Sequence, residues 1–324
     1  MSFRFKTLVS AVSIALVTAL PGAAHAAWPD KAVTLIVPWA AGGSTDILAR
    51  LLSESLSQKY GQPFVVENRS GASGNIGSSF VARAKPDGYT LLVGSMSTHT
   101  MNQALYSTMP FDGVKDFTPI AKVALVTNTM VINPSLPVNS VAEFIEYAKA
   151  RPGEIAYASA GPGSTNHLSA AMFEKATGIE LLHVPYRGGA PAVLDTVAGQ
   201  TKVLFTAGTQ SLPFVKDNKL KLLAVTENQK APTLPDTPTV AETVSGYELA
   251  VWYGVFGPAG MDPALVKTLS NDINLALQKP EVIEKLEGMS VQALQSTPEQ
   301  FAQDLARDAA KFDAVIRDLG IRID

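Results

Sequence analysis

Two short loops of closely similar sequence carry the residues best suited to binding an anion. Gly43-Ser44-Thr45-Asp46 recurs as Gly163-Ser164-Thr165-Asn166. Each loop precedes an amphipathic helical stretch. The first N–H groups of a helix have no partner within the helix and carry partial positive charge, so such loops favour a carboxylate or another anion. We therefore expect the two loops to face one ligand.

The segments around each loop predict a strand–helix–strand unit. An apolar run precedes each loop, at residues 33–37 and 155–158, and a similar tag closes each unit, Arg69-Ser70-Gly71-Ala72 and Arg187-Gly188-Gly189-Ala190. Strands and helices alternate along the rest of the chain, which predicts an α/β fold of two lobes, each a mostly parallel sheet flanked by helices. Ligands of such sheets bind beyond the carboxyl ends of the strands, where both loops lie.

Several other elements are predicted from local signals. Helices are expected over residues 77–84 and 141–150, the second with a capping box formed by Ser140 and Glu143, and another after Thr297. Residues 94–100 are expected to form a hydroxyl-rich loop after a strand. Residues 249–256 are predicted to be a strand that crosses back to the first lobe.

Residues 1–26 have the organisation of a cleavable signal peptide. Arg4 and Lys6 precede an apolar stretch over residues 8–20, and Ala24-His25-Ala26 provides small residues for cleavage. We expect the remaining chain to divide into lobe 1, residues 27–127 and 252–324, and lobe 2, residues 128–251. The chain has no cysteine, which excludes disulfides and a lipidated cysteine as a membrane anchor.

Composition and missing motifs argue against several functions. Without the signal, 24 basic residues stand against 29 acidic ones, which argues against a nucleic-acid partner. His99, His167 and His183 lack metal-ligand spacing, so we expect no metal site. No dinucleotide fingerprint, phosphate-binding lysine loop or Gly-x-Ser-x-Gly sequence occurs, so no cofactor and no catalytic residue is predicted. A secreted α/β hydrolase whose catalytic residues meet only in the fold is the alternative from another functional class.

Individual side chains in these loops have two interpretations each. Asp46 either caps its own helix or accepts a hydrogen bond from a ligand. Trp39 and Tyr186 either shape a flat ligand or pack in the core. Arg187 suits a carboxylate partner, although its counterpart Arg69 suggests that both arginines brace their lobes. His167 either lines the site or is structural.

Collinear motifs along the chain resemble one known family. They are Pro38-Trp39-Ala40-Ala41-Gly42-Gly43-Ser44-Thr45-Asp46, Val66-Glu67-Asn68-Arg69-Ser70-Gly71-Ala72, Lys85-Pro86-Asp87-Gly88-Tyr89-Thr90, Ala160-Gly161-Pro162-Gly163-Ser164, Val184-Pro185-Tyr186-Arg187-Gly188-Gly189, Phe256-Gly257-Pro258-Ala259-Gly260 and Thr297-Pro298-Glu299-Gln300-Phe301. The sequence resembles the Bug family, the extracytoplasmic solute receptors of tripartite tricarboxylate transporters.

The resemblance implies a monomeric, two-lobed periplasmic binding protein of the Venus-flytrap type. Such a protein captures a small organic carboxylate, a di- or tricarboxylate or an aromatic acid, for integral-membrane permease subunits. A sensor that presents its ligand to a signalling partner is a further alternative. The resemblance implies ligand contacts from Ala41, Gly42, Gly43, Asp46, Ser159, Ala160, Gly161 and Thr165. We add Ser97 and Thr206 from other strand-end loops, and Trp39 and Tyr186 as aromatic candidates.

Overall fold

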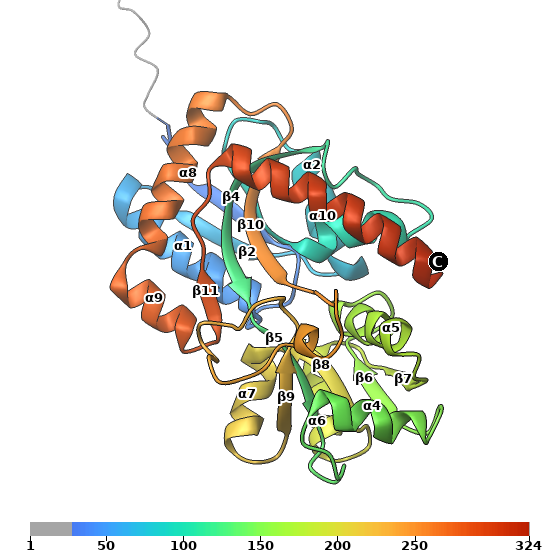
Figure 1. Ribbon diagram of the computed structural model, residues 1–324. Coiled ribbons are helices and arrows are strands. Elements are labelled where there is room, and N and C mark those ends of the chain that lie inside the picture. Colours follow the sequence, from blue (N-terminus) through green and yellow to red (C-terminus); the bar gives the residue numbers. More distant parts are fainter. Residues whose placement is uncertain (1–27, 324) are drawn as a thin grey trace, which may run out of the picture.

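The computed structural model describes residues 28–323, so the predicted signal peptide lies outside the described residues. Figure 1 shows two lobes, each built on one sheet that helices flank. The sheet of lobe 1 has the order β11 (Val291–Ala293), β4 (Phe117–Val126), β10 (Val251–Pro258), β3 (Thr90–Ser95), β1 (Val33–Val37) and β2 (Phe64–Asn68). The sheet of lobe 2 has the order β7 (Leu182–Pro185), β6 (Ala156–Ser159), β8 (Val203–Ala207), β5 (Asn128–Ile132) and β9 (Lys221–Val225). The predicted two-lobed α/β architecture is confirmed.

Helices cover both sheets. Those of lobe 1 are α1 (Ser44–Tyr60), α2 (Asn75–Ala82), α3 (Asn102–Leu105), α8 (Pro263–Leu277), α9 (Pro280–Glu287) and α10 (Pro298–Leu319), with short helical turns at Ala72–Gly74 and Ser97–Met101. Those of lobe 2 are α4 (Val141–Lys149), α5 (Thr165–Thr177), α6 (Gly189–Val197) and α7 (Gly208–Lys216), with a short turn at Val240–Glu242.

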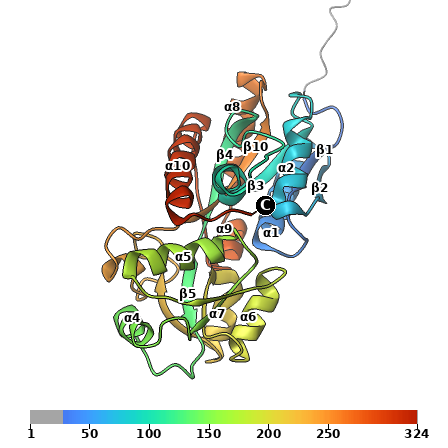
Figure 2. The same cartoon turned by 90° about the vertical axis from the view of Figure 1, so that its right-hand side faces the viewer.

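Both sheets are mixed rather than mostly parallel. β1 pairs in parallel with β2 and β3, and β6 pairs in parallel with β7 and β8. β10 runs antiparallel to β3 and β4, and β5 runs antiparallel to β8 and β9. The antiparallel strands lie where the chain passes between the lobes. β5 is the first strand of lobe 2 after β4, and β10 carries the chain back to lobe 1. Figure 2 shows β4 and β5 one above the other, in different lobes.

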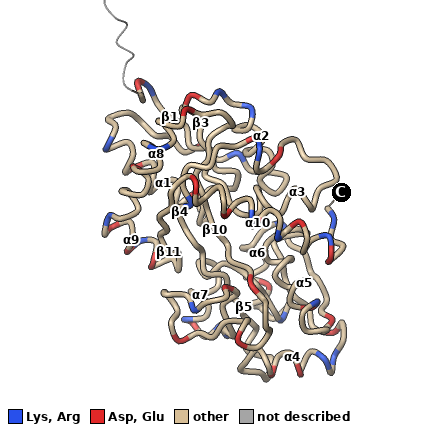
Figure 3. The backbone as a smooth tube through the Cα atoms, turned by 45° about the horizontal axis from the view of Figure 1, so that its top comes forward, with Lys and Arg blue, Asp and Glu red and all other residues tan. Residues whose placement is uncertain are grey.

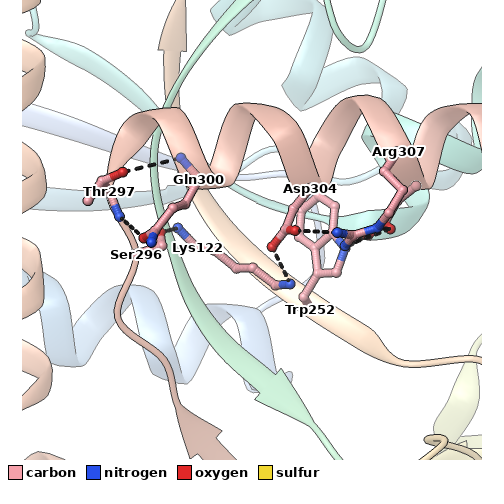
Figure 4. Close-up of polar contacts among 8 residues, drawn as sticks. Lys122, Trp252, Ser296, Thr297, Gln300, Asp304 and Arg307 are labelled. Carbon is pink, nitrogen blue, oxygen red and sulfur yellow. Dashed lines mark hydrogen bonds and ion pairs between the residues drawn. The ribbon is translucent and has the colours of Figure 1, made fainter.

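Local sequence signals set most element boundaries. Helix α1 buries Leu48, Leu52 and Leu56 against the sheet and ends at Gly61, whose φ of 66° is left-handed. Helix α10 begins with the predicted capping box, in which Thr297 and Gln300 each accept the other's backbone N–H (Figure 4).

Helix α10 is attached to the sheet of lobe 1 by partly buried polar contacts. Lys122 of β4 pairs with Asp304 at 3.0 Å (Figure 4). The indole N–H of Trp252 in β10 donates to Asp308 at 2.8 Å. These contacts hold the long helix across β4 and β10, on the side of lobe 1 where its last turns approach α5 of lobe 2 (Figure 2).

Three local predictions differ from the structure. Helix α2 begins two residues earlier than expected. Ser140 caps α4 by accepting the Glu143 N–H, but the Glu143 carboxylate accepts from Asn139 instead of Ser140, so only half of the capping box forms. Residues 94–100 are not a loop, because β3 continues to Ser95 and a helical turn follows directly.

Each lobe has its own hydrophobic core, and the surface charges are mixed. The lobe 1 core includes Leu168, which α5 of lobe 2 contributes, so the two lobes pack against each other. Figure 3 shows basic and acidic residues interspersed over both lobes. Within residues 28–323, no helix has both the length and the apolar character needed to cross a membrane.

Candidate functional site

The loop between β1 and α1 presents backbone N–H groups rather than charged side chains. Gly43 is the N-cap of α1 and makes no side-chain cap, and the first helical hydrogen bond runs from the Ile47 N–H to the Gly43 carbonyl. Residues 40–43 are exposed, and Gly42 has a φ of 86°, a conformation that favours glycine. The start of α1 therefore offers uncapped N–H groups and partial positive charge.

Asp46 holds this loop in place from beneath. Its carboxylate is 3% exposed and accepts the Gly42 N–H at 2.9 Å, the Asn68 amide at 3.0 Å, and Nε and Nη2 of Arg50 at 3.0 and 3.1 Å. Burial opposes ionisation, but the hydrogen bonds from Arg50, Gly42 and Asn68 outweigh it and lower the pKa of Asp46. Asp46 therefore does not cap its own helix, as one of its two predicted roles required, but braces the loop that precedes the helix. Its other predicted role, accepting a hydrogen bond from a ligand, stays a prediction.

The end of β3 lies beside this loop and contributes further hydroxyl groups. Ser95 and Ser97 are buried and their hydroxyls are 2.9 Å apart. Tyr253 of β10 is the register partner of Ser95, and its hydroxyl lies near the side chains of Ser44 and Thr45. Burial raises the pKa of Tyr253, so its hydroxyl stays neutral.

One hydrogen bond joins the two lobes at this point. The Ser44 hydroxyl at the start of α1 lies 3.0 Å from the Thr209 hydroxyl at the start of α7. Helix α7, like α1, has no side-chain cap, since its N-cap is Ala207. The positive ends of two helices from different lobes therefore meet at a pair of hydroxyl groups. This arrangement suits an anion that both helix ends bind.

The Gly163 loop differs from its Gly43 counterpart in two respects. Ser164 caps α5 by accepting the His167 N–H, so one of the free N–H groups is already satisfied. Gly163 has a φ of 72° and lies against the C-terminal segment, because a Cβ atom there would be 1.9 Å from Cδ1 of Ile323. The Ile323 N–H in turn donates to the Leu105 carbonyl of lobe 1 at 2.9 Å.

Beneath the Gly163 loop, Ser159 joins a cluster of aromatic rings. Its hydroxyl accepts the Gly161 N–H at 3.1 Å and lies 2.7 Å from Nε2 of His183. His183 stacks between Tyr157 and His167, at ring distances of 4.8 and 4.2 Å. Burial lowers the pKa of His183. Burial and the neighbouring His183 ring lower the pKa of His167 to about 4. Both rings are therefore neutral near pH 7. Ser159 is fully buried and shapes the loop from within.

The other predicted residues of lobe 2 lie at the same edge of its sheet. Ala160 and Gly161 are partly exposed in the loop, and Thr165 opens α5. Thr206 is buried at the end of β8, next to β6, and its hydroxyl donates to Gln210.

Trp39, Tyr186 and Arg69 have neighbours in their own lobes, whereas Arg187 is exposed and makes no ion pair or side-chain hydrogen bond within residues 28–323. Trp39 is partly buried against the lobe 1 core, and its carbonyl accepts from Asn68. Burial and a hydrogen bond to Asp195 raise the pKa of Tyr186 to about 12. Arg69 pairs with Glu67 and stacks on the Phe80 ring, 3.6 Å from its centroid, which favours the bracing role.

The residues that sequence reasoning missed are Ser44, Thr209 and Tyr253. Ser44 belonged to the recognised loop but was not among the expected ligand contacts. Thr209 follows the end of β8 and Tyr253 lies near the start of β10, and no glycine-rich loop marks either position in the sequence. Within residues 28–323 no group of three or more histidine, aspartate or glutamate side chains could hold a metal ion.

Comparisons with known proteins identify the relatives of this chain. The family model described as "Tripartite tricarboxylate transporter family receptor" matches residues 48–321. Protein BugT of Bordetella pertussis is 34% identical over 91% of each chain. The solved structure of Rpa4515 of R. palustris with adipate is 38% identical, with a TM-score of 0.84, covering 91% of this chain and 100% of that one. MatC of Rhodopseudomonas palustris with bound malate is 28% identical, with a TM-score of 0.79 over 89% of this chain and 100% of that one.

Proposed function

The chain belongs to the receptor family of tripartite tricarboxylate transporters, and on that premise we propose that it is a periplasmic receptor for a small aliphatic dicarboxylate. It would bind this ligand between its lobes and deliver it to the membrane permease subunits of such a transporter. The proposal includes the lobe boundaries and the loop residues expected from the sequence, with Ser44, Thr209 and Tyr253 added.

The observation that carries this proposal is the Ser44–Thr209 hydroxyl pair between two uncapped helix ends. Two positive helix ends repel each other unless an anion lies between them. Each helix end stabilises a bound anion by about 0.3–1 kcal/mol at an exposed site and by up to about 2 kcal/mol at a partly buried one. Hydrogen bonds to a charged group add about 1.5–3 kcal/mol each. A few such contacts reach about −8 kcal/mol, which is micromolar affinity.

An aliphatic dicarboxylate fits better than a flat aromatic acid. The related structures hold adipate and malate, which are both aliphatic dicarboxylates. The two aromatic side chains that would favour a flat ligand already have neighbours in their own lobes, since Trp39 packs on the lobe 1 core and Tyr186 packs against the lobe 2 core near Asp195. Two carboxylates also match helix ends contributed by two lobes.

A thermal-shift panel tests the proposal. The probes are aliphatic dicarboxylates from malonate to suberate, malate, benzoate and glucose. A ligand at 100 times its dissociation constant stabilises the protein by about 2.7 kcal/mol, which raises the melting temperature measurably. A panel in which no carboxylate raises the melting temperature, or in which glucose alone does so, overturns the proposal.

A pair of matched variants separates binding from folding. Thr209→Asp puts a negative charge at the site and at a helix N-terminus, so the ligand-free protein stays folded while the dicarboxylate response disappears. Thr268→Asp places the same charge on an exposed position of α8 and leaves the response unchanged. An undiminished response of Thr209→Asp contradicts the assignment of the site to these helix ends.

A further inference from the structure

Lobe 1 contains a surface cavity that shares no residue with the inter-lobe site. Its volume is about 520 Å³, it is open to the surface, and α2, the turn at Ala72–Gly74 and the segment 106–110 line it. Cavities that bind small molecules typically measure about 300–1,000 Å³. The size and the separate location make this cavity a candidate site of its own.

One wall of the cavity is an exposed apolar row on α2. Ile76 and Phe80 stand four residues apart, so they lie on the same helix face, and they are 56% and 41% exposed. Most large apolar side chains of lobe 1 are buried in its core instead. Adjacent exposed apolar groups beside a cavity indicate a surface that binds an apolar partner.

A polar row runs next to the apolar one. Asn75, Ser79 and Arg83 also follow a spacing of four and also line the cavity. Ser79 is 8% exposed, yet within residues 28–323 its hydroxyl has no hydrogen-bond partner. Within the same range, Arg83 has neither an ion pair nor a hydrogen bond. At the wall of one cavity, the exposed guanidinium of Arg83 and the Ser79 hydroxyl are thus left available as donors for a carboxylate.

The second arginine at the cavity strengthens this combination of charge and apolar surface. The Arg69 guanidinium lies 3.6 Å from the centre of the Phe80 ring and pairs with Glu67. Its charge is therefore largely compensated, and it holds the Phe80 ring in place. Arg83 is left as the uncompensated cation of the cavity.

We propose that this cavity is a second binding site, for a small monocarboxylate with a flat or branched apolar body. The Arg83 guanidinium binds the carboxylate, and the Ser79 hydroxyl donates a further hydrogen bond. Ile76 and Phe80 cover the apolar body of the ligand. The proposal is independent of the ligand of the inter-lobe site, because no residue belongs to both sites.

A titration of 4-fluorobenzoate followed by fluorine NMR tests this site on the full chain. We expect saturable binding, and a dissociation constant at least about tenfold higher in the Ser79→Ala/Arg83→Gln double variant. Tenfold is the loss expected for one charge-assisted hydrogen bond. A melting curve of the double variant like that of the wild type shows that the fold is intact.

Two control variants make the outcome specific. Arg317→Gln removes an exposed arginine from α10, far along the chain from α2, and leaves the dissociation constant unchanged. Thr209→Asp blocks the inter-lobe site and also leaves it unchanged. The proposal is overturned if the wild type does not bind the probe, if the double variant binds as tightly as the wild type, or if Thr209→Asp abolishes binding, since the probe then occupies the inter-lobe site.

Discussion

Replacing Asp46 with asparagine tests whether this buried carboxylate holds the Gly43 loop. Asparagine has one acceptor oxygen, so either the Gly42 N–H or the Asn68 amide loses its bond. The Asn68 amide cannot turn over, because its nitrogen also donates to the Trp39 carbonyl at 3.1 Å. One lost bond to a charged acceptor costs about 1.5–3 kcal/mol, and an unsatisfied buried donor costs about 1–3. We expect Asp46→Asn to lower the free energy of unfolding by about 2–4 kcal/mol.

A matched control is available on α10. Asp313 accepts from Arg317 four residues later, as Asp46 does from Arg50, but the Asp313 side chain is 44% exposed whereas that of Asp46 is 3% exposed. Exposed pairs contribute little, so Asp313→Asn should change the free energy of unfolding by less than about 1 kcal/mol. Urea unfolding of the wild type and both variants measures the difference.

The pH dependence gives a second readout for the same variant. The pKa of Asp46 is lower in the folded state than the ordinary value of about 3.9. Its stabilisation is therefore complete above about pH 4 and is lost as the pH falls through the folded-state pKa. The gap between wild type and Asp46→Asn should narrow in acid. Equal losses in Asp46→Asn and Asp313→Asn at pH 7 would refute the bracing role.

Three further predictions concern packing, binding and acid stability. Gly77→Ala places a Cβ atom 2.9 Å from Cα of Pro38, a backbone atom that can shift only at a cost in free energy. The free energy of unfolding should therefore fall by about 1–3 kcal/mol, and an unchanged midpoint of urea unfolding would contradict this. Ser44→Ala and Thr209→Val should each weaken dicarboxylate binding measured by calorimetry. Comparison with the double variant should give a coupling energy of about 0.5–1.5 kcal/mol, and strictly additive losses of binding free energy would refute a shared contact. Because the pKa of His167 is lowered to about 4, the folded state disfavours the protonated imidazolium, and the free energy of unfolding should fall as the pH drops from about 6.5 toward 4. If the free energy of unfolding of His167→Gln falls as steeply over this pH range as that of the wild type, His167 is not the cause.

Local chemistry explains which parts of the fold the sequence predicted. Helix α1 ends at Gly61 because glycine adopts the left-handed conformation there, and α10 begins at Thr297 because its capping box satisfies two N–H groups. Such signals depend only on residues a few positions apart. The strand–helix–strand units were recognisable for the same reason.

Long-range contacts explain what the sequence did not reveal. Residues 97–101 form a helical turn rather than a loop, and His99 in that turn stacks on Phe256, at a ring distance of 3.9 Å. The reversed strands β5 and β10 depend on where the chain crosses between lobes. In the candidate site, Ser44 and Thr209 are 165 positions apart, so their contact has no local signal.

The contact of Ile323 with both lobes has a practical consequence. Its N–H is bonded to Leu105, and its side chain touches Gly163 in the other lobe. The chain has no cysteine, so Arg322→Cys creates a single position for an environment-sensitive dye. If the lobes move relative to each other on binding, the emission of that dye should change along a ligand titration. The receptor would then serve as a reagentless fluorescent sensor for the acid that it binds.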